Sequence, residues 1–261
     1  MGQAKRRKVE IEFLKQLGPH VDPASTNPEP TAEMARQLHA LFEAARQDAN
    51  IDPPVKFLYT KLGQTIQNFG QLPIACKKGC SHCCYIWVSA TAPELLFIAK
   101  IIRSRGHEAI ERVRSAHQKT AAFDFDTRGD HPTPCPLLDR DVCSIYESRP
   151  RSCRLAASAD AEICARSYHG VTNEDIPTPA LHLMGRTTYA IASAVALRQS
   201  NLPYHAYEFN SGLARALEVQ DAEKLWLAGT DIFSDVMRDP SNIFDEPPTQ
   251  WMFRHAFRNN P

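Results

Sequence analysis

The cysteines of this chain are confined to one stretch of the sequence, and that stretch constrains the fold more than any other feature. The chain has 261 residues, and all eight of its cysteines lie in the segment 76–164. They are Cys76, Cys80, Cys83, Cys84, Cys135, Cys143, Cys153 and Cys164. Unrelated cysteines would not gather in this way, so we expect these thiols to act together, as disulfides or as metal ligands.

Three features favour metal binding over a disulfide framework. The basic N-terminus is followed by no apolar stretch of the kind found in a secretory signal, so the expected compartment is the reducing cytoplasm. The chain is long enough to bury a sizeable core without cross-links. Cys83 and Cys84 are adjacent, which suits a metal loop better than two independent disulfides. The sequence therefore predicts bound zinc or iron, including iron in an iron–sulfur cluster.

We predict all eight cysteines as metal ligands. Gly79 gives the first loop the backbone freedom to turn its thiols toward one ion. The next three cysteines are separated by eight and ten residues, which suits a short hairpin followed by a turn. Seven thiols exceed one tetrahedral site, so two metals and a single cluster with bridging or open thiols both remain possible. Cys164 could instead be an ordinary buried residue, and a ligand role for His82 stays open.

A site rich in thiolates carries negative charge that neighbouring donors should offset. Four thiolates around a divalent zinc ion leave a net charge of about −2. The basic residues beside the cysteines in the sequence are Lys77, Lys78, Arg149, Arg151 and Arg154. From these we select Arg149 and Arg154 as partners of the centre. Tyr146 could cover the metal with its ring and donate its hydroxyl to a sulfur or a carbonyl. A surface position is the alternative for all three.

Composition argues against several classes of partner. The 30 lysines and arginines balance the 30 aspartates and glutamates, so the chain has no overall positive field to attract nucleic acid. The basic start, residues 5–8, nevertheless leaves a nucleic-acid or ribosome-associated factor as an alternative. No apolar run approaches the ~20 residues of a membrane span, so we expect no membrane helix. The sequence identifies no protein partner.

Periodic patterns predict a mostly α fold around a small, irregular, cysteine-rich metal-binding centre with a short β-hairpin, and an α+β fold is the alternative. Helices are expected over residues 31–50, 55–69, 92–106, 108–123, 160–168, 180–199, 208–219 and 221–228. The segment 124–134 reads as a polar loop, and the last thirty residues predict no clear element. We expect a basic arm and Pro-rich linker (1–30), a helical segment (31–70), the cysteine-cluster domain (72–170) and a C-terminal helical region (171–261).

Evidence for an enzyme is limited to one motif. Cys76-x-x-x-Cys80-x-x-Cys83 matches the cluster loop of radical S-adenosylmethionine enzymes, but those enzymes use a β/α barrel and this chain has few strand patterns. No phosphate-binding loop, dinucleotide fingerprint or Ser-His-Asp order is found. The sequence leaves open whether the protein is an enzyme.

Two joint motifs, CKKGCSHCC at 76–84 and CPLLDRDVCSIYESRPRSCR at 135–154, resemble the bacterial YkgJ-like cysteine-cluster family, a zinc- or iron-chelating domain. The resemblance covers about residues 72–165. It implies a chelated metal, zinc or iron, which could be an iron–sulfur cluster, and it implies no settled reaction. A similar cysteine domain occurs in flagellin lysine methylases. An iron-dependent enzyme of group transfer or redox chemistry, for example protein lysine methylation, is therefore an alternative.

Overall fold

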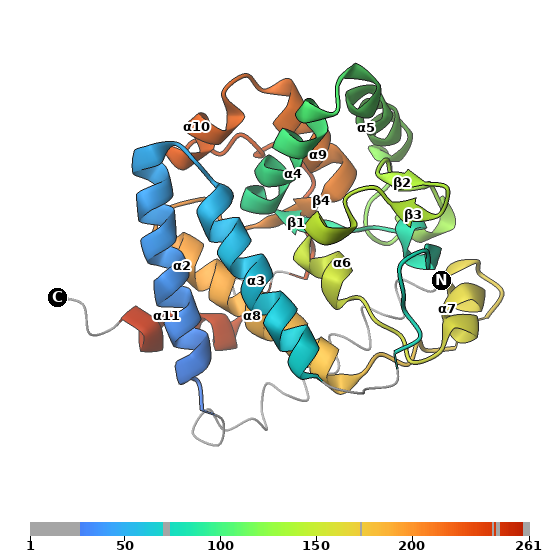
Figure 1. Cartoon of the computed structure of the whole chain (residues 1–261), viewed down its shortest axis with the longest axis horizontal. Helices are drawn as coiled ribbons and strands as arrows, with labels where there is room; N and C mark the ends of the chain where they lie inside the picture. Colours follow the sequence, from blue (N-terminus) through green and yellow to red (C-terminus); the bar gives the residue numbers. More distant parts are fainter. Residues whose placement is uncertain (1–26, 70–73, 173, 242, 244–245, 258–261) are drawn as a thin grey trace.

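The computed structural model describes residues 27–69, 74–172, 174–241, 243 and 246–257, and within them the chain is mostly helical, as predicted (Figure 1). The helices are α2 (Glu29–Asp48), α3 (Asp52–Asn68), α4 (Ala92–Ser104), α5 (His107–Thr120), α6 (Arg151–Leu155), α7 (Ala161–Tyr168), α8 (Ala180–Gln199), α9 (Phe209–Glu218), α10 (Ala222–Leu227) and α11 (Pro247–Phe257). Short 3₁₀ turns are η1 (His82–Tyr85), η2 (Arg128–Asp130) and η3 (Tyr146–Ser148).

Two small antiparallel sheets complete the described structure. In one, β1 (Ser89–Thr91) pairs with β4 (Ala206–Glu208). In the other, β2 (Leu138–Asp139) pairs with β3 (Val142–Cys143), which confirms the predicted hairpin with shorter strands than expected.

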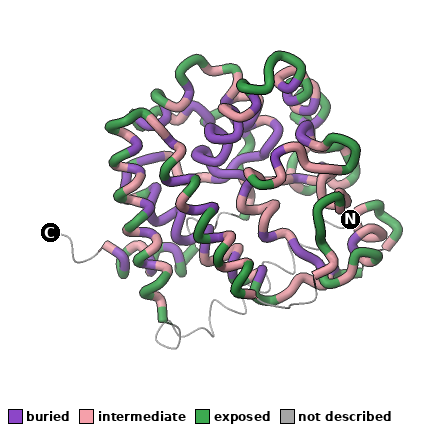
Figure 2. The backbone as a smooth tube through the Cα atoms, viewed as in Figure 1, coloured by how far each residue is buried: buried purple, intermediate pink, exposed green. Residues whose placement is uncertain are grey.

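The helices form two packed groups. Helix α2 packs against α3, α8 and α11, while α9 packs against α4 and α5. Figure 2 shows that the buried residues are concentrated in these two groups. The loops that carry the cysteines, together with α7, lie along one side of the molecule. The main apolar core includes the fully buried Leu62, Leu95, Trp226 and Phe233. The cysteine loops are therefore attached to the edge of a helical body.

Local sequence signals account for where several helices begin and end. Helix α4 begins after Thr91, and the Glu94 carboxylate accepts hydrogen bonds from the Thr91 N–H (3.0 Å) and hydroxyl (2.8 Å). This satisfies a donor that the start of a helix would otherwise leave unpaired. Helix α10 is followed by Gly229 at φ +96°, as a helix-ending glycine should be. Helix α8 has Pro179 at its N-cap and begins without a side-chain capping bond.

Three elements were not predicted from the sequence. The sheet of β1 and β4 joins segments far apart in the chain. Helix α6 has only five residues, too few for a periodic pattern. Helix α11 lies in the Pro-rich C-terminal part and begins at Pro247-Pro248, where proline is tolerated because the first helical N–H groups need no partner.

The role of the basic arm and the division into segments stay predictions. The basic arm falls within residues 1–26, outside the described residues. The main core mixes side chains from residue 38 to residue 236. Among the described residues, no helix combines the length and apolar character needed to cross a membrane.

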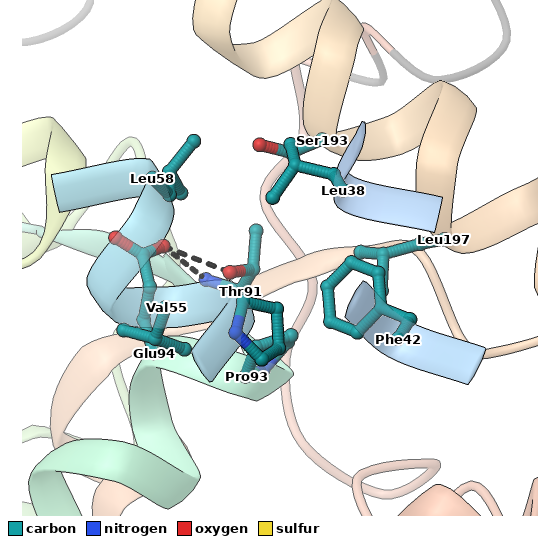
Figure 3. A pocket seen from close by; sticks show the side chains of 10 residues that line it. Leu38, Phe42, Val55, Leu58, Thr91, Pro93, Glu94, Ser193 and Leu197 are labelled. Carbon is teal, nitrogen blue, oxygen red and sulfur yellow. Dashed lines mark hydrogen bonds between the residues drawn. The ribbon is translucent and has the colours of Figure 1, made fainter. Parts of the chain in front are cut away.

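A small cavity lies among α2, α3, α8 and the start of α4 (Figure 3). Its volume is about 10 Å³, and Leu58, Thr91, Glu94 and Ser193 are among its lining residues. A space of this size holds about one water molecule. It could hydrate the buried Glu94 carboxylate, but it has no room for an organic substrate.

Two helical glycines provide a test of how tightly the α4–α9 contact is packed. A Cβ at Gly212 would lie 2.5 Å from Leu95 Cδ1, whereas a Cβ at Gly63 would meet nothing within 4 Å. Replacing a helical glycine by alanine gains about 1 kcal/mol, and overpacking a core costs about 1–3 kcal/mol. We expect Gly212→Ala to lower the free energy of unfolding in urea and Gly63→Ala to raise it. Equal effects of the two substitutions would contradict the packing at Leu95.

Candidate metal centre

The first cysteine loop is held by one backbone hydrogen bond within its turn and by one hydrogen bond to the sulfur of Cys76. The Cys80 N–H donates to the Lys77 carbonyl at 3.0 Å, and Gly79 occupies the turn at φ +93°, a conformation that favours glycine. The exposed Cys76 is fixed from the other side, because the Ser158 N–H donates to its Sγ at 3.3 Å. The loop is thus tied to the chain just beyond α6.

The second cysteine segment runs beside the first. The Cys135 N–H donates to the Cys84 carbonyl at 2.7 Å, and the Thr133 N–H donates to the Tyr85 carbonyl at 3.3 Å. These two bonds place the adjacent Cys83 and Cys84 next to the start of the segment that carries the remaining cysteines.

The β2–β3 hairpin then turns Cys143 back toward this junction. Arg140 and Asp141 form its two-residue turn with φ values of 45° and 62°, the left-handed pair typical of a tight hairpin turn. In the ladder, Cys143 lies opposite Leu138. The Ser81 hydroxyl donates to Asp141 Oδ1 at 3.0 Å, so the turn is also joined to the first loop.

Cys153 is brought in by the short helix α6. Its N–H donates to the Pro150 carbonyl at 2.9 Å. The second oxygen of the buried Glu94 accepts the Arg151 N–H at 2.6 Å, and the Ser152 hydroxyl donates to the Ser89 carbonyl at 2.6 Å. One carboxylate therefore holds the N-termini of both α4 and α6, and it anchors the Cys153 segment to the helical core.

Cys83 lies at the centre of the thiol group. It acts electrostatically on five other thiols, those of Cys76, Cys84, Cys135, Cys143 and Cys153, and in each case it raises the pKa. Thiols of the first loop, the hairpin segment and α6 thus all lie within electrostatic range of one sulfur. Cys80 joins this group through Cys76, on which it has the same effect.

Burial and neighbouring sulfurs favour the neutral form of these thiols. Burial is the main cause that raises the pKa of Cys76, Cys143 and Cys153, and it raises that of Cys135 to about 12. For Cys84 the first cause is a hydrogen bond with the Cys83 side chain, followed by burial. A bound cation would reverse this balance, because it stabilises the thiolate directly.

The chemistry of these donors fits zinc or iron. The group around Cys83 consists of thiols, the soft donors that select zinc and iron–sulfur centres over magnesium or calcium. Among the described residues, however, no three Cys, His, Asp or Glu side chains are arranged so that they could hold one metal ion. The thiols therefore share a neighbourhood without sharing a coordination point, and the ligand assignment stays a prediction.

The three residues predicted to support the centre occupy different positions. Arg149 lies near Cys76, Cys143 and Cys153, whose pKa values it lowers. Its guanidinium stacks 3.6 Å from the centre of the Tyr146 ring, which supplies a cation–π contact. The Arg154 guanidinium contacts backbone carbonyls and an aromatic ring of α3.

Arg154 donates to the carbonyls of Arg149 and Glu147 and lies 4.5 Å from the centre of the Tyr59 ring. It thereby shapes the backbone before α6 and packs this segment against α3. These contacts hold the loop that carries Arg149, and they leave a direct role of Arg154 toward the thiols as a prediction.

Helix α7 lies against the first cysteine loop, where it packs on η1. Its N-cap Asp160 accepts hydrogen bonds from the N–H groups of Glu162 and Ile163. Cys164 is buried in this helix, and the ring of His82 contacts that of His169 edge to face at 5.6 Å. Whether Cys164 and His82 bind metal stays a prediction.

Sequence reasoning missed two charged residues that organise this region. Glu94 does more than cap α4, since its second oxygen accepts the Arg151 N–H at the start of α6. Arg128, in the segment predicted as a polar loop, is 1% exposed and lies beside the cysteine segments. No local pattern distinguishes it from the surrounding solvent-exposed residues, because its burial results from pairing between distant segments.

The comparisons with known proteins support the same region. Residues 75–174 match the model of the CxxCxxCC family, described as a "putative zinc- or iron-chelating domain". The match covers a little over a third of the chain and includes all eight cysteines. No curated protein and no solved structure matches the chain.

Glu94 provides a test of how the centre is attached to the helical core. Glu94→Ala leaves the Thr91 and Arg151 N–H groups without their acceptor, and loss of a cap together with a buried unpaired donor costs roughly 2–4 kcal/mol. We expect that loss in the free energy of unfolding measured with urea. Glu94→Gln retains an acceptor oxygen and should lose less. Wild-type stability of the alanine variant would contradict the anchoring role.

Proposed function

We propose that this protein is a cysteine-cluster metal-binding protein that holds zinc or iron between its first cysteine loop, its β-hairpin and helix α6. The observation that carries this proposal is the position of Cys83, whose thiol acts on five other thiols from three segments. Seven of the eight cysteines are exposed or only partly buried, so filling the apolar core does not explain why they gather in one region, whereas metal binding does. The family match over residues 75–174 supports the same conclusion.

The ligands would come from the eight predicted cysteines, with those around Cys83 as the nucleus of the site. Bound zinc would supply cross-links between loops, whereas bound iron would add redox capacity or an open coordination position. The backbone bonds of the first loop and of α6 orient the thiols, and Arg149 adds positive charge beside three of them. The protein thus gathers soft donors in one region and places positive charge beside them.

Neither alternative function gains support from a described residue. An enzyme of group transfer or redox chemistry needs a substrate site, and the cavity of about 10 Å³ beside Glu94 is too small for one. The nucleic-acid alternative depends on the basic arm, which lies outside the described residues. Metal binding without an assigned reaction is therefore the function that the site supports best.

Metal content tests the proposal directly. We expect protein purified without oxygen to contain zinc or iron at one or two ions per chain, as measured by elemental analysis together with acid-labile sulfide. Zinc alone would favour a structural or chelating role, and iron with sulfide would favour an iron–sulfur cluster. Metal-free protein that takes up neither ion on reconstitution, under conditions that keep its thiols reduced, would overturn the proposal.

The central position of Cys83 predicts unequal effects of cysteine substitutions. Cys83→Ser should reduce metal content and melting temperature together, because metal binding contributes to folding free energy. Cys80→Ser should have the same effects to a smaller extent, since Cys80 lies at the periphery of the thiol group. Lys77→Ala changes an exposed residue of the same loop and serves as the control. Unchanged metal content in both serine variants would show that neither Cys80 nor Cys83 is a ligand.

A further inference from the structure

Arg128 is a fully buried arginine beneath the two cysteine segments. It is 1% exposed, and its guanidinium donates to three backbone carbonyls. These belong to Tyr85, His131 and Thr133. Tyr85 directly follows Cys84, and Thr133 stands two residues before Cys135. The guanidinium therefore contacts both of the segments that the hydrogen bond between Cys135 and Cys84 joins.

The positive charge of Arg128 has no ion-pair partner in the part of the chain that the structure describes. Its hydrogen bonds go to neutral carbonyls, and its Nε is buried without a partner. The acidic groups that act on it are the Glu208 carboxylate first and then the Cys135 thiol. Glu208 is itself buried and accepts the Ser211 N–H at 2.6 Å at the start of α9, so it compensates Arg128 through its charge but forms no direct ion pair with it.

A buried charge is tolerated in proteins when an opposite charge or strong hydrogen bonds compensate for the loss of water. Carbonyl oxygens satisfy the donors of Arg128 without neutralising it. An arginine remains protonated at any physiological pH, so the region carries a permanent positive charge next to Cys135. Metal-bound thiolates at this position would add negative charge on the side of Arg128 that faces the cysteine segments.

We propose that Arg128 is the fixed counter-charge of the metal–thiolate centre and that it stabilises the negative charge of Cys135 and its neighbours when they bind metal. This inference rests on the proposed function. It also specifies the charge of the centre, because a buried cation favours a site with a net negative charge. That condition requires three or more thiolates around a divalent ion and disfavours a neutral site with two.

Arg128 differs in this respect from the arginines that adjoin the cysteines in the sequence. Arg149 is only half-buried and stacks on Tyr146, so water and the ring share in stabilising its charge. Arg128 is shielded from water, and a charge in a dry environment acts more strongly on its neighbours. It is thus the basic residue whose removal should affect metal affinity most directly.

The test compares Arg128→Gln with Arg128→Lys in the full-length chain. Both variants lose the guanidinium fork, but only the lysine retains the charge. Zinc affinity is measured by competition with a chelator of known affinity, and the stability of the metal-free protein is measured by urea unfolding. We expect Arg128→Gln to bind zinc about 10–100-fold more weakly. Arg128→Lys should bind zinc more tightly than the glutamine variant, although both lose metal-free stability.

Arg103 is exposed and offers a control for the loss of a guanidinium that binds carbonyls. Its guanidinium also donates to three backbone carbonyls, those of Ala216, Leu217 and Val219, but it does so at the contact between α4 and α9. Arg103→Gln should therefore lower stability and leave zinc affinity unchanged. An equal loss of zinc affinity in this control would show that the effect is a general consequence of destabilisation.

Other outcomes would overturn the inference. Equal zinc affinities of Arg128→Gln and Arg128→Lys would show that Arg128 holds the backbone in place and that its charge has no effect on metal binding. Should the glutamine variant fail to fold, the lysine variant decides the question. If Arg128→Lys loses zinc affinity in proportion to its loss of metal-free stability, the charge of Arg128 has no role of its own in metal binding. Wild-type protein that binds neither zinc nor iron would overturn the proposed function itself, a result distinct from wild-type affinity in the Arg128 variants.

Discussion

The hydrogen bond from the Cys135 N–H to the Cys84 carbonyl is the contact on which the cysteine region depends. It joins two segments that are far apart in the sequence and places Cys83 where the hairpin and α6 can approach it. Arg128 reinforces this junction, because its guanidinium donates to the Tyr85 carbonyl in one segment and to the Thr133 carbonyl in the other. Without this pairing, the first loop and the later cysteines would be separate elements, and neither alone would gather six thiols.

The elements that could be predicted from the sequence are those that depend on interactions between residues close together in the chain. Helix α4 was predicted because its start depends on neighbouring residues, Thr91 and Glu94. The β2–β3 hairpin was predicted for the same reason, since its turn and strands are contiguous. The sheet of β1 and β4 and the burial of Arg128 depend on segments that meet only in the folded chain. No local pattern encodes those contacts.

Arginines that are close to the cysteines in the sequence have different surroundings in the folded chain. The charge of Arg149 acts on three thiols. Arg154, next to Cys153 in the sequence, binds backbone carbonyls and lies over the Tyr59 ring. Arg128 precedes Cys135 by seven residues and lies beside it only because η2 folds under the junction. The electrostatics of this centre are therefore a property of the tertiary structure.

The helical body and the cysteine region are stabilised by different interactions, and this difference determines what a bound metal would contribute to stability. The helical body has a continuous apolar core, whereas none of the residues 74–86 is buried (Figure 2). The later cysteine segments contribute only Leu137, Ile145 and Leu155 as buried members of that core. Hydrogen bonds such as those of Glu94 fix the backbone here, but each contributes only about 1 kcal/mol. The apolar core does not extend into the first cysteine loop, and coordination bonds to a shared ion would stabilise this region instead. Metal binding and the final ordering of the region should therefore be one coupled process.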